Sequence, residues 1–274
     1  MKIHLLNTGF CSVSEHHLLR GAPHHPTTAA AICALLEHPT QGLVLFDTGY
    51  APRVSEAFKV WPFSLYGRVT PVTARAEWSA ASQLKRLGFQ ARDVRYVIAS
   101  HLHADHTGGL RDFPAAQVVL TRAAQGISRL RDWRALHHAF VPDLLPDDFE
   151  TRVVVIGDFR DAPLEPFGTT HDLFGDGTLR LVELPGHARG QIGAYLPNEN
   201  VLLVADGAWS MRAIRDNHPP HILPLRVAFD SAYQTLKTLE KLHRFHLEHP
   251  QVKLLPTHCP QLAAMVNSGE SVAL

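Results

Sequence analysis

Four side chains of the types that bind metal ions lie within six residues of one another, directly after an apolar segment. They are His101, His103, Asp105 and His106, and the apolar Val94–Ala99 before them is typical of a buried strand. In extended backbone, side chains two residues apart point the same way, so His101 and His103 can face one ion together. If the chain then turns at the following Gly-Gly pair, Asp105 and His106 can reach a second position nearby. The spacing predicts a metal site at the end of a strand.

Histidine is frequent throughout this chain, and it is the commonest metal ligand in proteins. Nineteen histidines stand beside 26 lysines and arginines together. A histidine-rich loop can simply be solvated, but two imidazoles and a carboxylate beside two glycines are poor choices for packing, so we favour the metal site. The other histidines, among them His137 and His138, have no such spacing, and we expect most of them on the surface.

Composition excludes several classes of protein. The 274 residues are 45% apolar and 19% charged, as in an ordinary globular protein, and 26 basic residues balance 26 acidic ones. A balanced charge argues against nucleic-acid binding, and no apolar run approaches the roughly 18 residues of a membrane span. Three cysteines are too few for a disulfide scaffold, and Asn7 and Gly9 interrupt the N-terminus before a signal-peptide core develops. We therefore expect a reduced, cytoplasmic protein.

The apolar pattern predicts a chain that mixes strands and helices, which excludes a purely parallel sheet. Strands are expected at residues 2–6, 29–36, 42–46, 94–99, 117–120, 152–156, 178–184, 192–196, 201–205 and 252–255. Helices are expected at residues 77–87, 123–145 and 227–247, the second of them broken by Pro142 and Pro146. Because no repeat or linker is visible, we expect residues 1–274 to form a single domain.

Residues 51–75 are rich in proline and aromatic side chains, and we expect them to be irregular, as a lid or an interface loop. Trp61, Phe63 and Tyr66 would give an apolar substrate pocket suited to an acyl chain. The alternative is a hydrophobic patch that holds the loop against the body of the protein or against a second copy in a homodimer.

The His-x-His-x-Asp-His pattern resembles the signature of the metallo-β-lactamase superfamily, and later landmarks of that family follow in order. They are Asp47 in Phe-Asp-Thr-Gly, His187 in Pro-Gly-His, Asp206 in Val-Ala-Asp-Gly and His258 in Pro-Thr-His-Cys. Each alone would be weak, because a single Asp after a strand is more often a turn former. The resemblance implies an α/β fold: a four-layer αββα sandwich of mixed sheets with helices on both outer faces.

The resemblance also implies a centre of two divalent metal ions. His101, His103 and His187 would hold one ion, Asp105, His106 and His258 the other, and Asp206 would be shared. Asp47 would support a ligand without itself binding metal. Imidazole and carboxylate ligands favour Zn²⁺, with Fe, Mn or Co as alternatives. The candidate catalytic residues are Asp105, Asp206 and Trp209.

Charge arithmetic indicates the chemistry of such a centre. Two divalent ions carry four positive charges, and two carboxylates with a bridging hydroxide remove three, which leaves a site that can stabilise an anionic tetrahedral intermediate. Within the family, Asp206 argues against the true β-lactamases, which lack an aspartate at the bridging position. The complete ligand set argues against the mononuclear iron dioxygenases. Superfamily nucleases usually carry large added domains or a basic surface, and a neutral chain of 274 residues offers no obvious room for either.

The segment from Leu84 to Gly109 is most similar to the N-acyl homoserine lactonases. That similarity implies a quorum-quenching hydrolase in which the hydroxide between the metals attacks the lactone carbonyl of a small-molecule substrate. One position departs from the family, because these lactonases often place a tyrosine where this chain has Trp209. An indole N–H can donate a hydrogen bond but cannot exchange a proton in the same way, so Trp209 is either catalytic or a pocket wall.

Two other functions remain open at this point. The first is hydrolysis of an acyl thioester, as in glyoxalase II or a coenzyme A thioesterase. Only 16 residues follow His258, which disfavours the C-terminal glutathione contacts of glyoxalase II. The second is a non-catalytic relative that keeps the fold and binds a ligand, which complete retention of the ligand types disfavours.

Overall fold

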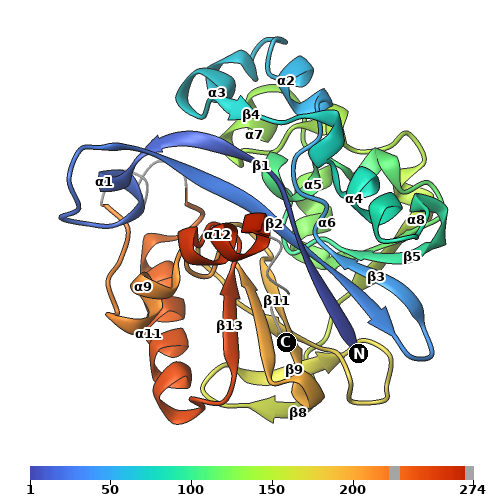
Figure 1. The fold of residues 1–274 in the computed structure, drawn as a ribbon, viewed down its shortest axis with the longest axis vertical. Coiled ribbons are helices and arrows are strands. Elements are labelled where there is room, and N and C mark those ends of the chain that lie inside the picture. The colour runs from blue at the N-terminus through green and yellow to red at the C-terminus, as the bar shows by residue number, and fades with distance from the viewer. Residues whose placement is uncertain (222–228, 269–274) are drawn as a thin grey trace.

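Two β-sheets packed face to face form the centre of the protein, and helices cover their outer faces (Figure 1). The computed structural model describes residues 1–221 and 229–268. The first sheet has the strand order β4-β1-β2-β3-β5-β6-β7, and the second has the order β13-β12-β11-β10-β9-β8. The first-sheet strands are β1 (Lys2–Ser14), β2 (Pro26–His38), β3 (Gly42–Phe46), β4 (Val72–Thr73), β5 (Val94–Ile98), β6 (Gln117–Thr121) and β7 (Val153–Ile156). The second-sheet strands are β8 (Asp161–Leu164), β9 (Gly168–Asp172), β10 (Arg180–Glu183), β11 (Ile192–Leu196), β12 (Val201–Ala205) and β13 (Lys253–Pro256).

Both sheets are mixed, as predicted. In the first, β1, β2 and β3 are antiparallel neighbours, whereas β3, β5, β6 and β7 run parallel. In the second, β9 to β12 are antiparallel, and β13 is parallel to β12. Parallel neighbours end at the same edge of a sheet, so Phe46 pairs with Ile98 in one sheet and Ala205 with Pro256 in the other. The segments that follow β3 and β5 therefore start close together, as do those that follow β12 and β13.

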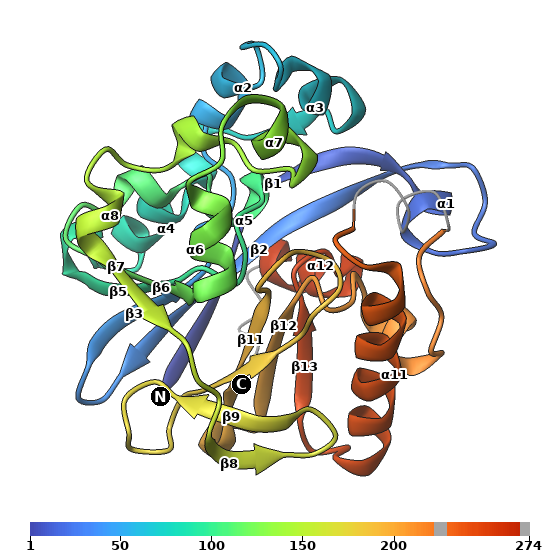
Figure 2. The same ribbon diagram turned by 180° about the vertical axis from the view of Figure 1, so that it is seen from behind.

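The side chains that alternate along each strand divide the interior into layers. On β2, Leu36 faces the second sheet and packs in a cluster with Ile192 and Leu203, whereas Leu35 faces the helices on the other side. The outer face of the second sheet packs against Leu242 and other apolar residues of helix α11 (Figure 2). The predicted four-layer αββα arrangement is therefore confirmed.

The helices lie on the two outer faces and at the strand ends. They are α1 (Glu15–Leu18), α2 (Arg53–Ala57), α3 (Ser64–Val69), α4 (Ala80–Arg86), α5 (Ala104–Thr107), α6 (Arg122–Ser128), α7 (Asp132–His137), α8 (Phe149–Arg152), α9 (Met211–Arg215), α11 (Ala232–Glu248) and α12 (Pro260–Ser268). None of the helices in the described part of the chain is both long and apolar enough to cross a membrane.

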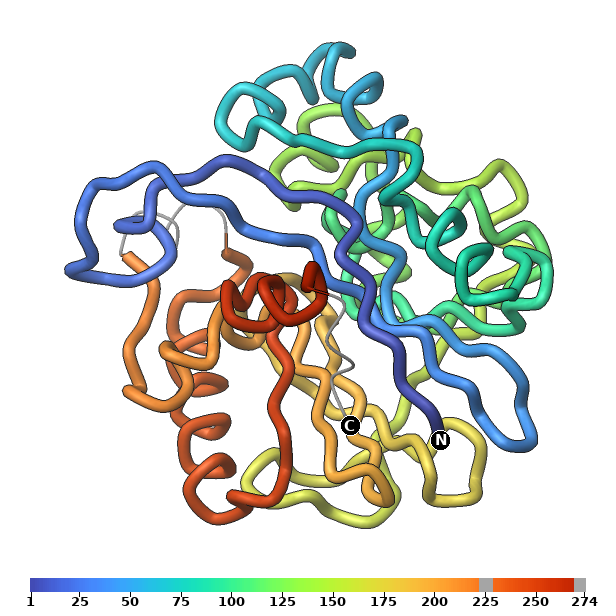
Figure 3. Tube along the Cα trace, viewed as in Figure 1, coloured from blue at the N-terminus to red at the C-terminus, as the bar shows by residue number. Residues whose placement is uncertain are grey.

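The tip of the long β1–β2 hairpin lies beside the segment that follows α9 (Figure 3). The backbone N–H of Arg20 donates to the carbonyl of Pro219, and the N–H of His221 donates to the carbonyl of His17. These contacts hold α1, at the hairpin tip, against the second half of the chain.

Residues 51–75 differ from the expectation of an irregular segment, because they form α2, α3 and β4. The prediction took the prolines as signs of irregular chain, but they lie at helix starts. Pro52 is the N-cap of α2, and Pro62 precedes the N-cap of α3. A proline at a helix start has no N–H to leave unpaired there, so it is compatible with a short helix. Phe63 anchors the segment in the core at 7% exposure.

Other boundaries differ where local sequence is ambiguous. The helix expected at 123–145 is α6 and α7 with a further short turn, and β8, β9, α9 and α12 were not expected. The last long helix was expected from residue 227, but the described helix α11 begins at Ala232, and residues 227 and 228 lie outside the described residues.

Candidate metal centre

Five strand ends meet at one edge of the two sheets and carry the predicted ligands. Asp47 follows β3, His101–His106 follow β5, His187 follows β10, Asp206 follows β12 and His258 follows β13. All eight of these side chains, scattered over the chain, are buried. The arrangement follows from the topology, because β3 and β5 are parallel, as are β12 and β13, and β10 and β12 both pair antiparallel with β11.

Glycine allows the loop after β5 to pack tightly against the loop after β3. A Cβ on Gly109 would lie 2.7 Å from the carbonyl oxygen of Thr48. At this close approach the backbone N–H of Thr48 donates to the carbonyl of His106 at 2.8 Å. The sequence interpretation that the Gly-Gly pair lets the chain tighten after the histidine motif agrees with this packing.

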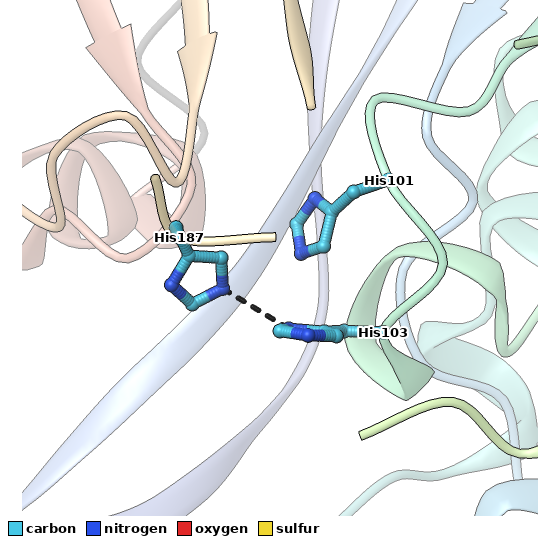
Figure 4. A group of neighbouring side chains, drawn as sticks. All are labelled: His101, His103 and His187. Carbon is cyan, nitrogen blue, oxygen red and sulfur yellow. Dashed lines mark hydrogen bonds between the residues drawn. The ribbon is translucent and has the colours of Figure 1, made fainter. Parts of the chain in front are cut away.

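Three histidines form the first group of potential ligands (Figure 4). His101, His103 and His187 each offer a ring nitrogen, and the three nitrogens lie within 4.8 Å of one another. His103 Nδ1 is 3.0 Å from His187 Nε2. Three imidazole nitrogens that converge in a buried site match the donor set of a divalent transition metal.

Two carboxylates and two histidines form the second group. Asp105, His106, Asp206 and His258 also place one ligand atom each within 4.8 Å of the others. Asp105 Oδ2 lies 3.4 Å from His106 Nε2 and 3.3 Å from His258 Nε2.

Asp206 joins the two groups. Its Oδ2 lies 3.2 Å from Nε2 of His187 in the first group and 3.0 Å from Nε2 of His258 in the second. Its Oδ1 lies 3.4 Å from Nε2 of His106. One carboxylate therefore faces both potential metal positions, as a shared ligand requires.

Unpartnered buried atoms test whether these residues fit metal ions. His101 Nε2, His106 Nε2 and Asp206 Oδ1 are buried and have no hydrogen-bond partner within the described residues. On two histidines the opposite ring nitrogen is held, since His106 Nδ1 lies 2.7 Å from Asp47 Oδ2 and His258 Nδ1 lies 2.6 Å from the carbonyl of Ala30. Both acceptors hold a proton on Nδ1, so Nε2, which faces the site, is the nitrogen left to bind a metal ion once it is deprotonated. The residues present fit divalent metal ions.

Asp47 contacts the ligands without joining either group. Its carboxylate accepts hydrogen bonds from the Ser100 N–H and hydroxyl, both at 2.8 Å, in addition to the contact with His106. Asp47 has a φ of 61°, and Ala205, just before Asp206, has a φ of 46°. Such left-handed conformations cost about 1–3 kcal/mol each outside glycine, and they concentrate at functional sites. Strain is stored at both strand ends that carry these aspartates.

The two groups differ in charge when no metal is bound. Burial lowers the pKa of His103 to about 3 and that of His187 to about 4, and it holds the pKa of His101 well below its ordinary value. The first group is therefore neutral at pH 7. Its lone pairs are available to a cation without release of a proton.

In the second group the carboxylates reverse the effect of burial. Burial alone would lower the pKa of His106 and His258, but nearby Asp105 and Asp206 raise both well above the ordinary value. The same contacts outweigh burial at the aspartates and hold the pKa of both carboxyls well below the ordinary value. Without metal this group consists of imidazolium–carboxylate pairs, so a metal ion must displace protons there.

Trp209 contacts the shared carboxylate. Its indole N–H donates to Asp206 Oδ2 at 2.9 Å. Its ring packs against Phe229 with centroids 5.2 Å apart and stands edge-on to His187 at 5.9 Å. Trp209 therefore contacts a potential ligand through its N–H and packs on Phe229 through its ring.

Two spaces adjoin the centre. The first, which we call the polar cavity, has a volume of about 80 Å³ and opens at His103 and His187. The polar side chains of its walls are His137, His138, Arg189 and Asp230. The second, which we call the apolar hollow, has a volume of about 10 Å³ and lies against Asp206, Trp209 and Leu18. Phe229 lines both spaces.

The aromatic residues expected in the pocket line neither space. Trp61 is 63% exposed and stands edge-on to Trp133 with centroids 5.2 Å apart. Phe63 is buried in the core, and Tyr66 packs on Phe58. Burial raises the pKa of Tyr66 well above its ordinary value, and the charge of Asp105 adds to this.

Sequence reasoning missed several residues of the site. Ser100 directly precedes the histidine motif, and its hydroxyl, which contacts Asp47, also lies 3.0 Å from His101 Nδ1. Its position next to the motif was a usable signal. Phe229, Arg189 and His138 carried no such signal, because only the tertiary fold brings them to the same cavity.

Comparison with known proteins agrees with this geometry. A profile of the metallo-beta-lactamase superfamily matches residues 29–246. The chain is similar to an N-acyl homoserine lactonase AttM of Azorhizobium caulinodans, with 31% identity over 217 residues that cover 75% of each chain.

Solved structures share the fold. An N-acyl homoserine lactone hydrolase with the product N-hexanoyl-L-homoserine bound at its catalytic metal centre has a TM-score of 0.72 at 19% identity, covering 96% of this chain and 95% of that one. AidC, a dizinc quorum-quenching lactonase, has a TM-score of 0.65 at 15% identity, covering 95% and 90%. The profile match, the relative above 30% identity and the site geometry together show that the chain belongs to the metallo-beta-lactamase superfamily.

Proposed function

We propose that the protein is a dinuclear metal hydrolase that opens the lactone ring of N-acyl homoserine lactones and thereby quenches quorum-sensing signals. The observation that carries the proposal is the carboxylate of Asp206, which lies within 3.2 Å of a histidine from each ligand group. The relatives named as N-acyl homoserine lactonases support the choice of substrate. The seven proposed ligands are His101, His103, Asp105, His106, His187, Asp206 and His258.

Zinc is the metal that we propose. The donor set consists of five imidazoles and two carboxylates, which suits Zn²⁺, although Fe, Mn and Co accept the same atoms. Two divalent ions held by these residues would lower the pKa of water to about 7, and so supply hydroxide, and would stabilise negative charge on the substrate carbonyl oxygen.

The protein's own groups position the ligands for this chemistry. Asp47 holds the ring of His106 through Nδ1, and Trp209 holds the carboxylate of Asp206 through a hydrogen bond of 2.9 Å. Since an indole N–H donates a hydrogen bond but does not act as an acid at neutral pH, we assign Trp209 to positioning rather than to proton transfer.

Ring opening also needs a proton at the departing ring oxygen. We assign this step to Asp105, whose carboxylate takes a proton from the attacking water and passes it to the ring oxygen. Asp105 is 8% exposed, whereas Asp206 is 3% exposed and accepts the bond from Trp209. The ester C–O bond of the lactone breaks, and the product is an N-acyl homoserine with a free carboxylate and a free hydroxyl.

Substrate would approach through the polar cavity, since this space opens directly at His103 and His187. The apolar hollow of about 10 Å³ is too small for an acyl chain in the described conformation. The amide and acyl groups therefore extend along the polar cavity toward the surface.

Two proposals concern location and assembly. The three cysteines are buried and unpaired, as in a reducing compartment, and we place the protein in the cytoplasm. We propose that the exposed pair Trp61 and Trp133 contacts a second copy in a homodimer, which sedimentation equilibrium of the Trp61→Ala variant would test.

Hydrolysis assays test the proposed function. Protein reconstituted with Zn²⁺ should release acid from N-hexanoyl homoserine lactone, and His103→Ala or Asp206→Asn should abolish this release. His25→Ala, at an exposed histidine outside both ligand groups, is the matched control and should keep full activity. Turnover of acyl thioesters without turnover of lactones, or binding of metal without turnover of either, would refute the proposal.

A further inference from the structure

The walls of the polar cavity carry charges that the metal centre does not use. Arg189 and Asp230 both line this space, yet neither side chain forms an ion pair or a hydrogen bond within the described residues. They do not pair with each other either, although they face one cavity. Among the residues that the structure describes, both charged groups are therefore unpaired at the cavity wall.

The cavity walls are held in place by backbone contacts. The backbone of Phe140 bridges to His103, which fixes the end of α7 beside the metal centre. The N–H of Asp230 donates to the carbonyl of His187 at 3.1 Å, and Ser231 N–H donates to the carbonyl of Gly186 at 2.9 Å. The segments that carry the two charges are therefore tied to the loop that carries a proposed ligand.

The charges that face the cavity sum to a neutral but polar surface. Arg189 is positive and Asp230 is negative. Burial, together with nearby His137 and Arg189, lowers the pKa of His138, so this imidazole is neutral at pH 7. The carboxylate of Asp230 would repel an anionic ligand. A purely apolar ligand would remove water from both charged groups without replacing the lost hydrogen bonds, which is unfavourable. The wall suits a neutral group that has both a donor and an acceptor.

We propose that Arg189 and Asp230 bind the amide of the substrate, with the guanidinium donating to the amide carbonyl oxygen and the carboxylate accepting from the amide N–H. This inference rests on the proposed function. In an N-acyl homoserine lactone the amide nitrogen is attached to the carbon next to the scissile carbonyl. A carbonyl placed at the metal centre therefore puts the amide within the adjoining cavity, which begins at His103 and His187.

The inference predicts a substrate class. Lactones that carry an acylamino group beside the carbonyl should be preferred over lactones that carry a plain alkyl chain at the same carbon. Both proposed residues are exposed at the rim, so each contact resembles an ordinary net hydrogen bond, which corresponds to about 3- to 10-fold in affinity.

The test compares two substrates in two variants. N-hexanoyl homoserine lactone and α-hexyl-γ-butyrolactone share the ring and the position of the chain, but only the first has an amide. For Arg189→Gln and for Asp230→Ala, the ratio of kcat/KM between the two substrates should fall about 3- to 10-fold, through a higher KM for the amide substrate. Arg215→Gln removes an exposed arginine that pairs with Asp216 and should leave the ratio unchanged.

The outcomes separate this inference from the proposed function. If the wild-type protein hydrolyses both lactones and the ratio stays the same in both variants, the amide contact is refuted and the lactonase remains. If the ratio falls equally in Arg215→Gln, the effect is nonspecific and the contact is again refuted. If the wild-type protein hydrolyses neither lactone, the proposed function fails and the inference fails with it.

Discussion

Replacement of Trp209 by phenylalanine removes one hydrogen bond from the carboxylate that faces both metal positions. The indole N–H donates to Asp206 Oδ2 at 2.9 Å, and the ring packs on Phe229. Phenylalanine keeps an aromatic ring at this place but has no donor. The substitution therefore tests the hydrogen bond with little change in packing.

The size of the effect follows from the burial of Asp206. A hydrogen bond to a charged group is worth about 1.5–3 kcal/mol net. Because Asp206 is 3% exposed, water replaces the lost donor poorly. Loss of a group that orients a metal ligand typically weakens metal binding about 10- to 100-fold, which agrees with this energy. Since Asp206 is shared between the two ligand groups, both metal ions should bind more weakly.

Competition with a chromophoric chelator measures this affinity directly. Metal-free wild type, Trp209→Phe and Trp133→Phe would be titrated with Zn²⁺ in the presence of the chelator. Trp133 is 53% exposed and belongs to neither ligand group, so its variant controls for loss of an indole. A dissociation constant within twofold of wild type in Trp209→Phe, or an equal loss in Trp133→Phe, would refute the positioning role.

Three further results are expected. Asp47→Asn replaces the acceptor that holds His106 Nδ1 at 2.7 Å, so zinc affinity should fall about 10- to 100-fold while circular dichroism stays native; unchanged affinity would contradict this. The carboxylates raise the pKa of His106 and His258 above the ordinary value, so these rings are protonated at pH 7 without metal, and zinc binding should release protons and weaken as the pH falls. Calorimetry in two buffers of different ionisation enthalpy measures that release, and its absence between pH 6 and 8 would refute the charge assignment. Chelation should lower the Tm by about 5–10 °C, because ligand at 100 times its Kd stabilises by about 2.7 kcal/mol, and an unchanged Tm after confirmed metal loss would argue against the site.

Local sequence predicted the ligand types well because the chemistry is concentrated in a short motif. His101, His103, Asp105 and His106 lie beside one another, and the structure brings them together with the more distant His258. The apolar pattern predicted most strands of the two sheets, since a short apolar run such as Leu43–Phe46 is typical of a buried strand. The four-layer architecture came from family resemblance rather than from these patterns.

What the sequence could not predict depends on contacts between distant segments. The cavity beside the centre joins His138, Arg189 and Phe229, which no local pattern connects. The hydrogen bond from Trp209 to Asp206 depends on the direction of the indole N–H, which spacing does not reveal. The prolines of residues 51–75 were taken as signs of irregular chain, although Pro52 caps a helix.

The most direct test of the account is the number of metal ions bound to each protein chain. Elemental analysis of protein purified without chelators and loaded with Zn²⁺ should find two ions per chain in the wild type. His103→Ala and His258→Ala, one from each ligand group, should each lose at least one ion. A wild-type protein that binds no transition metal, or variants that retain two ions, would contradict the two-metal centre on which the proposed hydrolysis depends.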